Sequence, residues 1–265
     1  MPRPPGRPRA EAVLAAVPEL APYARDAALL HPERGQPDRG SSSLGGPLLW
    51  PADEPWPTCS LPDETDPDPD GGPATAMVPV AQIFRRDVPG PWWPDGIDVL
   101  QVLWCPNEHW DPPARQSEGS PVVEVRWRRA ADVADRLTDP PAPVRFDEDG
   151  YLPRACTLTA EYVTDFPFRD ELPEEIRPRL AESVRALGDG GDAITRLGGW
   201  KLGGWPTWHL NHPAVFECAD CGTTMTLLFT AASDAETGVV VGRYGDLRVF
   251  TCPADHRHGF QVDLH

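Results

Sequence analysis

The sequence has no uninterrupted apolar run long enough for a membrane-spanning helix, and it is poor in positive charge. A spanning helix needs about 18 to 20 consecutive apolar residues, whereas proline or charge breaks every apolar stretch sooner. The N-terminal segment also lacks a secretory apolar core, so we expect a cytoplasmic protein that does not bind membranes. The 24 lysines and arginines against 41 aspartates and glutamates give a net charge of −17 at pH 7. That charge repels duplex nucleic acid and favours a basic partner.

Common catalytic fingerprints are also missing. The sequence contains no G-x-S-x-G elbow, no P-loop and no dinucleotide-binding glycine motif, so no catalytic residue is assigned and enzyme activity stays open. Proline and glycine are abundant, 34 and 23 in a chain of 265 residues, which indicates many loops and turns. Ten tryptophans supply large apolar surfaces to bury. We therefore expect a folded globular protein rather than a disordered one.

Several short segments have the composition of β-strands. In one of them, Val123, Val125 and Trp127 alternate with charged residues, which is typical of a half-buried strand. Strands are expected at 77–84, 99–104, 122–127, 225–230, 239–242 and 247–251. The predicted fold class is α+β, strand-rich, with mostly antiparallel sheets.

Helices are expected in two places. Apolar residues recur at helical spacing between Pro173 and Gly188, which predicts a helix over 173–187. Residues 10–30 have helical composition but are cut by two prolines, which predicts two short helical pieces. The basic residues 1–9 are interpreted as a tail and the acidic, proline-rich residues 61–74 as an exposed loop.

An ordered set of motifs occurs twice along the chain. LGGPLLW at 44–50 returns as LGGWPTW at 202–208, each followed by an apolar strand. DVLQVLWCP at 98–106 then matches DLRVFTCP at 246–253. The economical interpretation is a duplicated unit. We expect a tail and short helices over 1–40, then one domain over 41–265 whose repeats, about 41–150 and 190–265, are joined by a helical segment at 151–189.

The cysteines of the second repeat have the spacing of a zinc knuckle. Cys218 and Cys221 form a C-x-x-C followed by a glycine, and Cys252 lies downstream. Zinc prefers four such ligands in a tetrahedron, so we predict a structural Cys₃His site. Both His256 and His258 are candidates for the fourth ligand. His256 is preferred because His109 has the same offset from Cys105 in the first repeat.

The first repeat retains part of this set. Cys59, Cys105 and His109 are present, but no second cysteine stands beside Cys59. Three protein ligands with an open position describe catalytic zinc, which gives a zinc hydrolase as the alternative function. The other interpretation is that these residues are relics of a lost site, with the cysteines buried as small apolar side chains.

The motifs also resemble a known family. The segments SSSLGGPLLWPADEPWP, MVPVAQIF, KLGGWPTW, CADCGTTMTLLF and GDLRVFTCP resemble the YwqG-like family of bacterial proteins of unknown function, over roughly residues 41–265. A more distant similarity exists to programmed cell death protein 2 and its relatives, which look like chaperones for a ribosomal protein. The resemblance implies a strand-rich α/β fold and a partner-binding role. His209 and Asn211 depart from the bacterial pattern.

Aromatic residues suggest where a partner binds. Trp92 and Trp93 stand between prolines and are expected to be exposed, with packing over a sheet edge as the alternative. Lys201, Trp205 and Trp208 crowd a double glycine turn that can present them to a ligand or cap the core. The leading hypothesis is a zinc-stabilised module that binds a basic protein or peptide between its repeats, either as a chaperone or to neutralise a toxin.

Overall fold

The structure is a computed structural model that describes residues 10–61, 73–146, 149–187, 194–208 and 212–265. The predicted basic tail, most of the predicted acidic loop, and the positions of His209 and Asn211 lie outside these described residues. Within the described part of the chain, no helix is long and apolar enough to cross a membrane.

The regular elements of the described residues are mostly strands, with a few short helices. The helices are α1 (Ala10–Ala16), α2 (Arg177–Ala186) and the 3-10 turns η1 (Pro18–Tyr23), η2 (Ala130–Asp132), η3 (Asp149–Tyr151) and η4 (Arg169–Glu171). The strands are β1 (Arg25–Arg34), β2 (Ser43–Leu44), β3 (Thr58–Cys59), β4 (Thr75–Ala76), β5 (Val78–Phe84), β6 (Val99–His109), β7 (Ser120–Arg128), β8 (Cys156–Asp165), β9 (Lys201–Gly203), β10 (Thr226–Ala232), β11 (Asp246–Thr251) and β12 (Gln261–Leu264).

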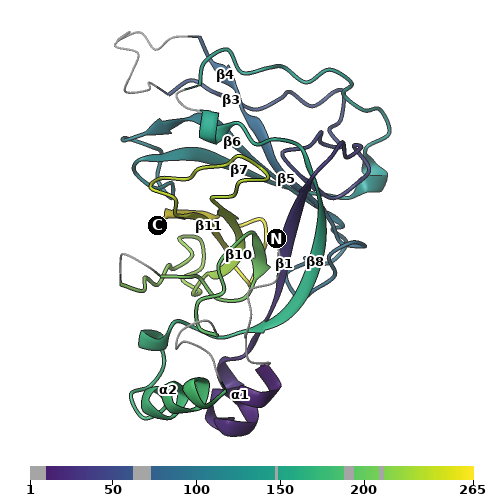
Figure 1. Ribbon diagram of the computed structural model, residues 1–265. Coiled ribbons are helices and arrows are strands. Elements are labelled where there is room, and N and C mark those ends of the chain that lie inside the picture. The colour runs from purple at the N-terminus through teal and green to yellow at the C-terminus, as the bar shows by residue number, and fades with distance from the viewer. Residues whose placement is uncertain (1–9, 62–72, 147–148, 188–193, 209–211) are drawn as a thin grey trace.

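Ten strands build one antiparallel sheet, and β3 and β4 pair separately. The sheet order is β12-β11-β10-β9-β1-β8-β2-β5-β6-β7. The long strands β1 and β8 lie side by side in its middle (Figure 1). The strands of the first half flank β8, and those of the second half flank β1. Strand β1, which precedes the first half in sequence, thus borders the second half, and β8, which precedes the second half, borders the first.

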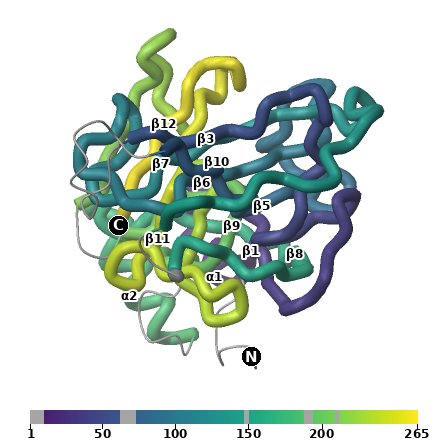
Figure 2. Tube along the Cα trace, turned by 90° about the horizontal axis from the view of Figure 1, so that it is seen from above, coloured from purple at the N-terminus to yellow at the C-terminus, as the bar shows by residue number. Residues whose placement is uncertain are grey.

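The sheet curls so that its two ends approach each other (Figure 2). At this closure, the N–H of Val262 in β12 donates to the carbonyl of Arg115, just before β7. Next to it, the rings of Trp127 and His256 meet edge to face at 6.3 Å. The concave side encloses one apolar core with buried residues from both halves, such as Trp104 of β6 and Phe229 of β10. The two halves thus share one apolar core.

Neither central strand is predicted by the sequence. Residues 1–40 were expected to hold only a tail and short helices, and 151–189 only a helical segment, yet β1 and β8 fall in them. The alanines and leucines of β1 favour a helix in isolation, but long-range pairing with β8 and β9 overrides that local preference. Pro32 is tolerated in β1 because β9 pairs only with residues 27–29, so no ladder bond is lost there.

The predicted helices are confirmed in shortened form. Residues 10–30 give α1 and η1 before the chain enters β1, and the helix expected over 173–187 is α2. At one end of the molecule, α1 and α2 pack together (Figure 1), burying Val13, Leu180 and Val184 in a small second core. Of the predicted strands, only 239–242 is absent, with a single bridge between Asp234 and Val239 in its place.

The two halves have the same strand register. Val78 pairs with Trp104 in the first half, and Thr226 pairs with Thr251 in the second. Each ladder then has one irregularity at the next step, between Pro79 and Ala81 in β5 and between Leu227 and Phe229 in β10. Beyond the irregularity, the pairs again match one for one down to the end of each ladder. Such bulges are specific local features, so corresponding positions can be assigned residue by residue.

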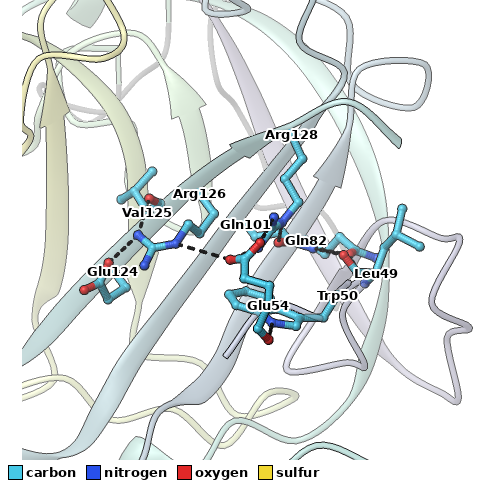
Figure 3. Close-up of polar contacts among 9 residues, drawn as sticks. All are labelled: Leu49, Trp50, Glu54, Gln82, Gln101, Glu124, Val125, Arg126 and Arg128. Atoms are coloured by element: carbon cyan, nitrogen blue, oxygen red, sulfur yellow. Dashed lines mark hydrogen bonds and ion pairs between the residues drawn. The ribbon is translucent and has the colours of Figure 1, made fainter. Parts of the chain in front are cut away.

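A second shared feature anchors the turn after each LGG motif. Gln101 of β6 donates through its side chain to the carbonyl of Leu49 (Figure 3). The corresponding residue of β11, Arg248, donates in the same way to the carbonyl of Thr207. An arginine also lies over the tryptophan that ends each motif, with 4.3 Å from guanidinium carbon to ring centroid for Arg128 over Trp50 and the same distance for Arg248 over Trp208.

Candidate metal centres and a candidate partner pocket

A Cys₃His group lies where a short knuckle meets the end of β11. The knuckle closes through backbone bonds from Gly222 N–H to the Cys218 carbonyl and from Cys218 N–H to the Thr223 carbonyl. Gly222 has a φ of 71°, a left-handed conformation that glycine adopts without strain. The turn directs the thiols of Cys218 and Cys221 toward Cys252, and the Sγ atoms of Cys221 and Cys252 lie 3.6 Å apart.

The fourth member of this group is His258, not the preferred His256. The ligand atoms of the three cysteines and His258 all lie within 4.8 Å of one another, and His258 Nδ1 is 3.5 Å from Cys218 Sγ. The cause is a turn in which Asp255 accepts hydrogen bonds from the backbone of Arg257 and, through its carbonyl, from that of His258. This turn brings His258 back to the thiols and leaves the His256 ring against Trp127.

Hydrogen bonds around the group prepare it for a cation. The hydroxyl and backbone of Thr223 lower the pKa of Cys221 to about 6, which favours the thiolate that binds metals. Asp220, inside the knuckle, accepts a hydrogen bond from the Gly259 backbone and pairs with Arg115 at 3.5 Å. The knuckle, the His258 loop and the segment before β7 are thereby fixed relative to one another.

The first half contains a buried Cys₂His group. Cys59 lies at the end of β3, while Cys105 and His109 lie on β6, and all three are at most 5% exposed. His109 Nε2 is 3.2 Å from Cys105 Sγ and 3.5 Å from Cys59 Sγ. A hydrogen bond from the Cys105 thiol lowers the pKa of Cys59 to about 4, and the same bond raises the pKa of Cys105.

Burial of this second group bears on the hydrolase alternative. The side chains of Cys59, Cys105 and His109 are all buried among the described residues. A catalytic zinc needs an open position that the substrate reaches. Burial of all three side chains fits a closed metal site better than a hydrolase.

Four of the five predicted partner-binding residues belong to the interior or its margin. Trp93 is 7% exposed and donates to the Val88 carbonyl, so the expectation of an exposed tryptophan pair is wrong. Lys201 is buried in an ion pair with Asp165, and Trp208 is buried under Arg248. Trp205 donates to a backbone carbonyl at Tyr23. Lys201, Trp205 and Trp208 thereby hold the LGG turn of the second half in place.

Trp92 is the exception, because it lines a pocket. Its ring lies close over Gly203, whose missing side chain leaves the necessary room. The pocket has a volume of about 250 Å³ and is also lined by Asp26 of β1 and Tyr162 of β8. Tyr162 is 52% exposed. Burial and the negative charge of Asp87 raise the pKa of Tyr162. Sequence analysis misses Asp26 and Tyr162 because it does not predict β1 and β8.

A second pocket, of about 210 Å³, lies in the seam where the sheet closes. It is lined by Val125 and Trp127 of β7 and by the loop from His256 to Phe260. Arg257, the arginine of its lining, forms an ion pair with Asp255, with 2.5 Å between Nη2 and Oδ2. With no acidic residue in its lining, this pocket does not suit a basic partner, although it lies between the two halves where a binding groove was expected.

Sequence comparisons leave the family open. Neither the family models nor the curated proteins yield a match to this chain. The YwqG-like resemblance and the more distant one therefore stay predictions. The fold and the sites define a strand-rich protein with a large antiparallel sheet and Cys/His groups that could hold metal ions.

Proposed function

We propose that this protein is a zinc-stabilised binding protein for a basic protein or peptide. The observation that carries the proposal is the pocket over the paired strands β1 and β8, whose lining includes Trp92, Tyr162 and Asp26. Aromatic faces attract cationic side chains, and a carboxylate adds a charged acceptor for an arginine or lysine. The net charge of −17 supports the same choice, because it accelerates encounter with a basic partner.

Zinc has a structural role in this proposal. Zn–S bonds of about 2.3 Å and Zn–N bonds of about 2.0 Å place tetrahedral ligand atoms about 3.5 to 3.8 Å apart. The 3.5 Å between Cys218 and His258 and the 3.6 Å between Cys221 and Cys252 fit that geometry. Zinc at this site ties the knuckle to the end of β11. We also infer that the two halves arose by duplication, which their common register supports.

The zinc assignment is tested on the purified full chain. Elemental analysis should find zinc, and Cys221→Ser should remove one ion per chain and loosen the knuckle, because metal binding contributes directly to folding. The Cys156→Ser variant is the matched control, since Cys156 is a buried cysteine outside both Cys/His groups. Wild-type protein without zinc would contradict the assignment.

The partner assignment is tested with labelled peptides. Fluorescence anisotropy should show binding of an arginine-rich peptide and none of a glutamate-rich peptide of equal length. Tyr162→Ala should weaken binding about 5-fold or more, from loss of about 1 kcal/mol of cation–π attraction, and Asp26→Asn should weaken it too. Tyr244→Ala is the control, because Tyr244 is 82% exposed and does not line the pocket. Equal affinity for both peptides, or no effect of Tyr162→Ala, would contradict the proposal.

A further inference from the structure

The buried Cys₂His group occupies the same place in the first half as the Cys₃His group in the second. Cys105 directly follows Trp104, which pairs with Val78, and Cys252 directly follows Thr251, which pairs with Thr226. The common register makes Cys105 and Cys252 corresponding residues. A methionine accompanies each cluster as well, Met77 in the first and Met225 in the second. The first half thus presents ligands where the second half presents its metal-binding group.

The distances in the buried group match those of ligands around one zinc ion. A sulfur and a nitrogen of a zinc tetrahedron lie about 3.5 Å apart. His109 Nε2 lies 3.5 Å from Cys59 Sγ and 3.2 Å from Cys105 Sγ. One imidazole nitrogen thereby faces two sulfurs, which is the arrangement of three ligands converging on one ion.

Charge balance makes the same group suitable for zinc in a dry interior. Burying an uncompensated charge is costly, but two thiolates neutralise a divalent cation. Cys59 and Cys105 as thiolates, together with neutral His109, would therefore form a zinc complex with no net charge. Soft sulfur and imidazole ligands select zinc over magnesium or calcium, which prefer oxygen.

Asn107 supplies the supporting contacts that such a site requires. It is 1% exposed, and its Nδ2 donates to Cys105 Sγ at 3.7 Å, a contact that favours the thiolate. Its Oδ1 is buried without a hydrogen-bond partner among the described residues. Buried polar atoms of this kind are costly unless something satisfies them. A water in the fourth position of the ion would donate to this oxygen.

We propose that Cys59, Cys105 and His109 bind a second zinc ion, with water as the fourth ligand and Asn107 as the acceptor of its hydrogen bond. This ion fastens β3 to β6, the strand next to the β7 edge of the large sheet. The site is closed and structural, and it differs from the hydrolase alternative in that it requires no substrate access.

Zinc stoichiometry and coordination in the wild-type full chain test this proposal. Elemental analysis should find two zinc ions per chain. X-ray absorption at the zinc edge should give an average of about 2.5 sulfur ligands per ion, because one group has three cysteines and the other two. One ion per chain with about three sulfurs would overturn the second site and leave the proposed function intact. No zinc at all would contradict both.

Variants locate the ions. Cys105→Ser and Cys221→Ser should each lower the zinc content by one ion per chain, and Cys156→Ser should leave it at two. Should Cys105→Ser fail to fold, His109→Gln tests the same loss with a smaller change in volume. A His109→Gln protein that folds and still holds two ions would overturn the assignment.

Discussion

Lys201 and Asp165 form an ion pair in which both side chains are 1% exposed and the Nζ–Oδ2 distance is 3.0 Å. Lys201 also donates to the carbonyls of Leu197 and Trp205, while Asp165 accepts hydrogen bonds from the backbones of Phe166 and Trp205. The pair therefore joins the LGG turn of the second half to the end of β8. The only lysine of the sequence is a structural residue.

Breaking this pair should destabilise the protein strongly. Asp165→Asn leaves a buried ammonium without its counter-charge, and such losses cost about 3–5 kcal/mol. Urea unfolding followed by tryptophan fluorescence measures the change. Asp132→Asn is the control, because its pair with Arg129 is 59% exposed on both sides and is worth under about 1 kcal/mol. Equal effects of the two variants would refute the assigned role.

Thr223 should tune the affinity of the Cys₃His group without being a ligand. Thr223→Val removes the hydroxyl that lowers the pKa of Cys221, so protons compete more effectively with zinc. Zinc affinity should fall about 10- to 100-fold, and the loss should grow as the pH is lowered. Competition with a chromophoric chelator measures it. Thr159→Val, an exposed β8 change far in sequence from the knuckle, should leave the affinity unchanged.

The ion pair between Glu54 and Arg128 should give a pH-dependent stability. Arg128 holds Glu54 through two hydrogen bonds of 2.6 and 2.7 Å (Figure 3) and lowers its pKa below the ordinary 4.5. The contribution is therefore present above pH 4.5 and is lost as the pH falls through the folded-state value. Solvent screening limits it to about 1 kcal/mol.

The measurement compares wild type with Glu54→Gln. Their difference in unfolding free energy should be greatest near pH 6 and should shrink toward zero as the pH falls below the ordinary glutamate range. A difference that is constant over this range would show that packing, rather than the charge of Glu54, stabilises the contact.

Salt and mutation should act on different rate constants of partner binding. The Debye length is about 8 Å at physiological ionic strength and shortens as salt is added. Added salt should therefore slow association of the arginine-rich peptide with the acidic protein. Tyr162→Ala should instead speed dissociation, because short-range contacts set the lifetime of a complex. Surface plasmon resonance separates the two. An association rate that is insensitive to salt would remove the steering argument.

The sequence predicts the parts of the fold whose signal is local. The alternation of Val123, Val125 and Trp127 predicts β7, and helical spacing predicts α2. The C-x-x-C at Cys218 predicts the knuckle, because two ligands at fixed spacing constrain their own turn. Strands β1 and β8 give no such signal, since what holds them in the sheet is pairing with residues far away in the sequence.

Two site residues are misplaced by sequence analysis, one because of a local turn and one because of a long-range contact. His258 displaces His256 because the side chain of Asp255 shapes the turn between Cys252 and the ligand. Trp93 is buried because the chain folds back onto Trp127, with the two ring centroids 6.0 Å apart. No spacing rule in the sequence encodes either contact.

The exchange of central strands affects how the chain folds as it leaves the ribosome. β1 is synthesised early, but its neighbours β8 and β9 are made only after the whole first half. His31 of β1, for example, cannot pair until Thr159 of β8 has been synthesised. Until then, β1 and the outer edge of β2 expose unpaired backbone groups, which are templates for strands of other chains. Two nascent copies that exchange these strands would form the native pairings between molecules, so a swapped dimer is the characteristic misassembly of this topology.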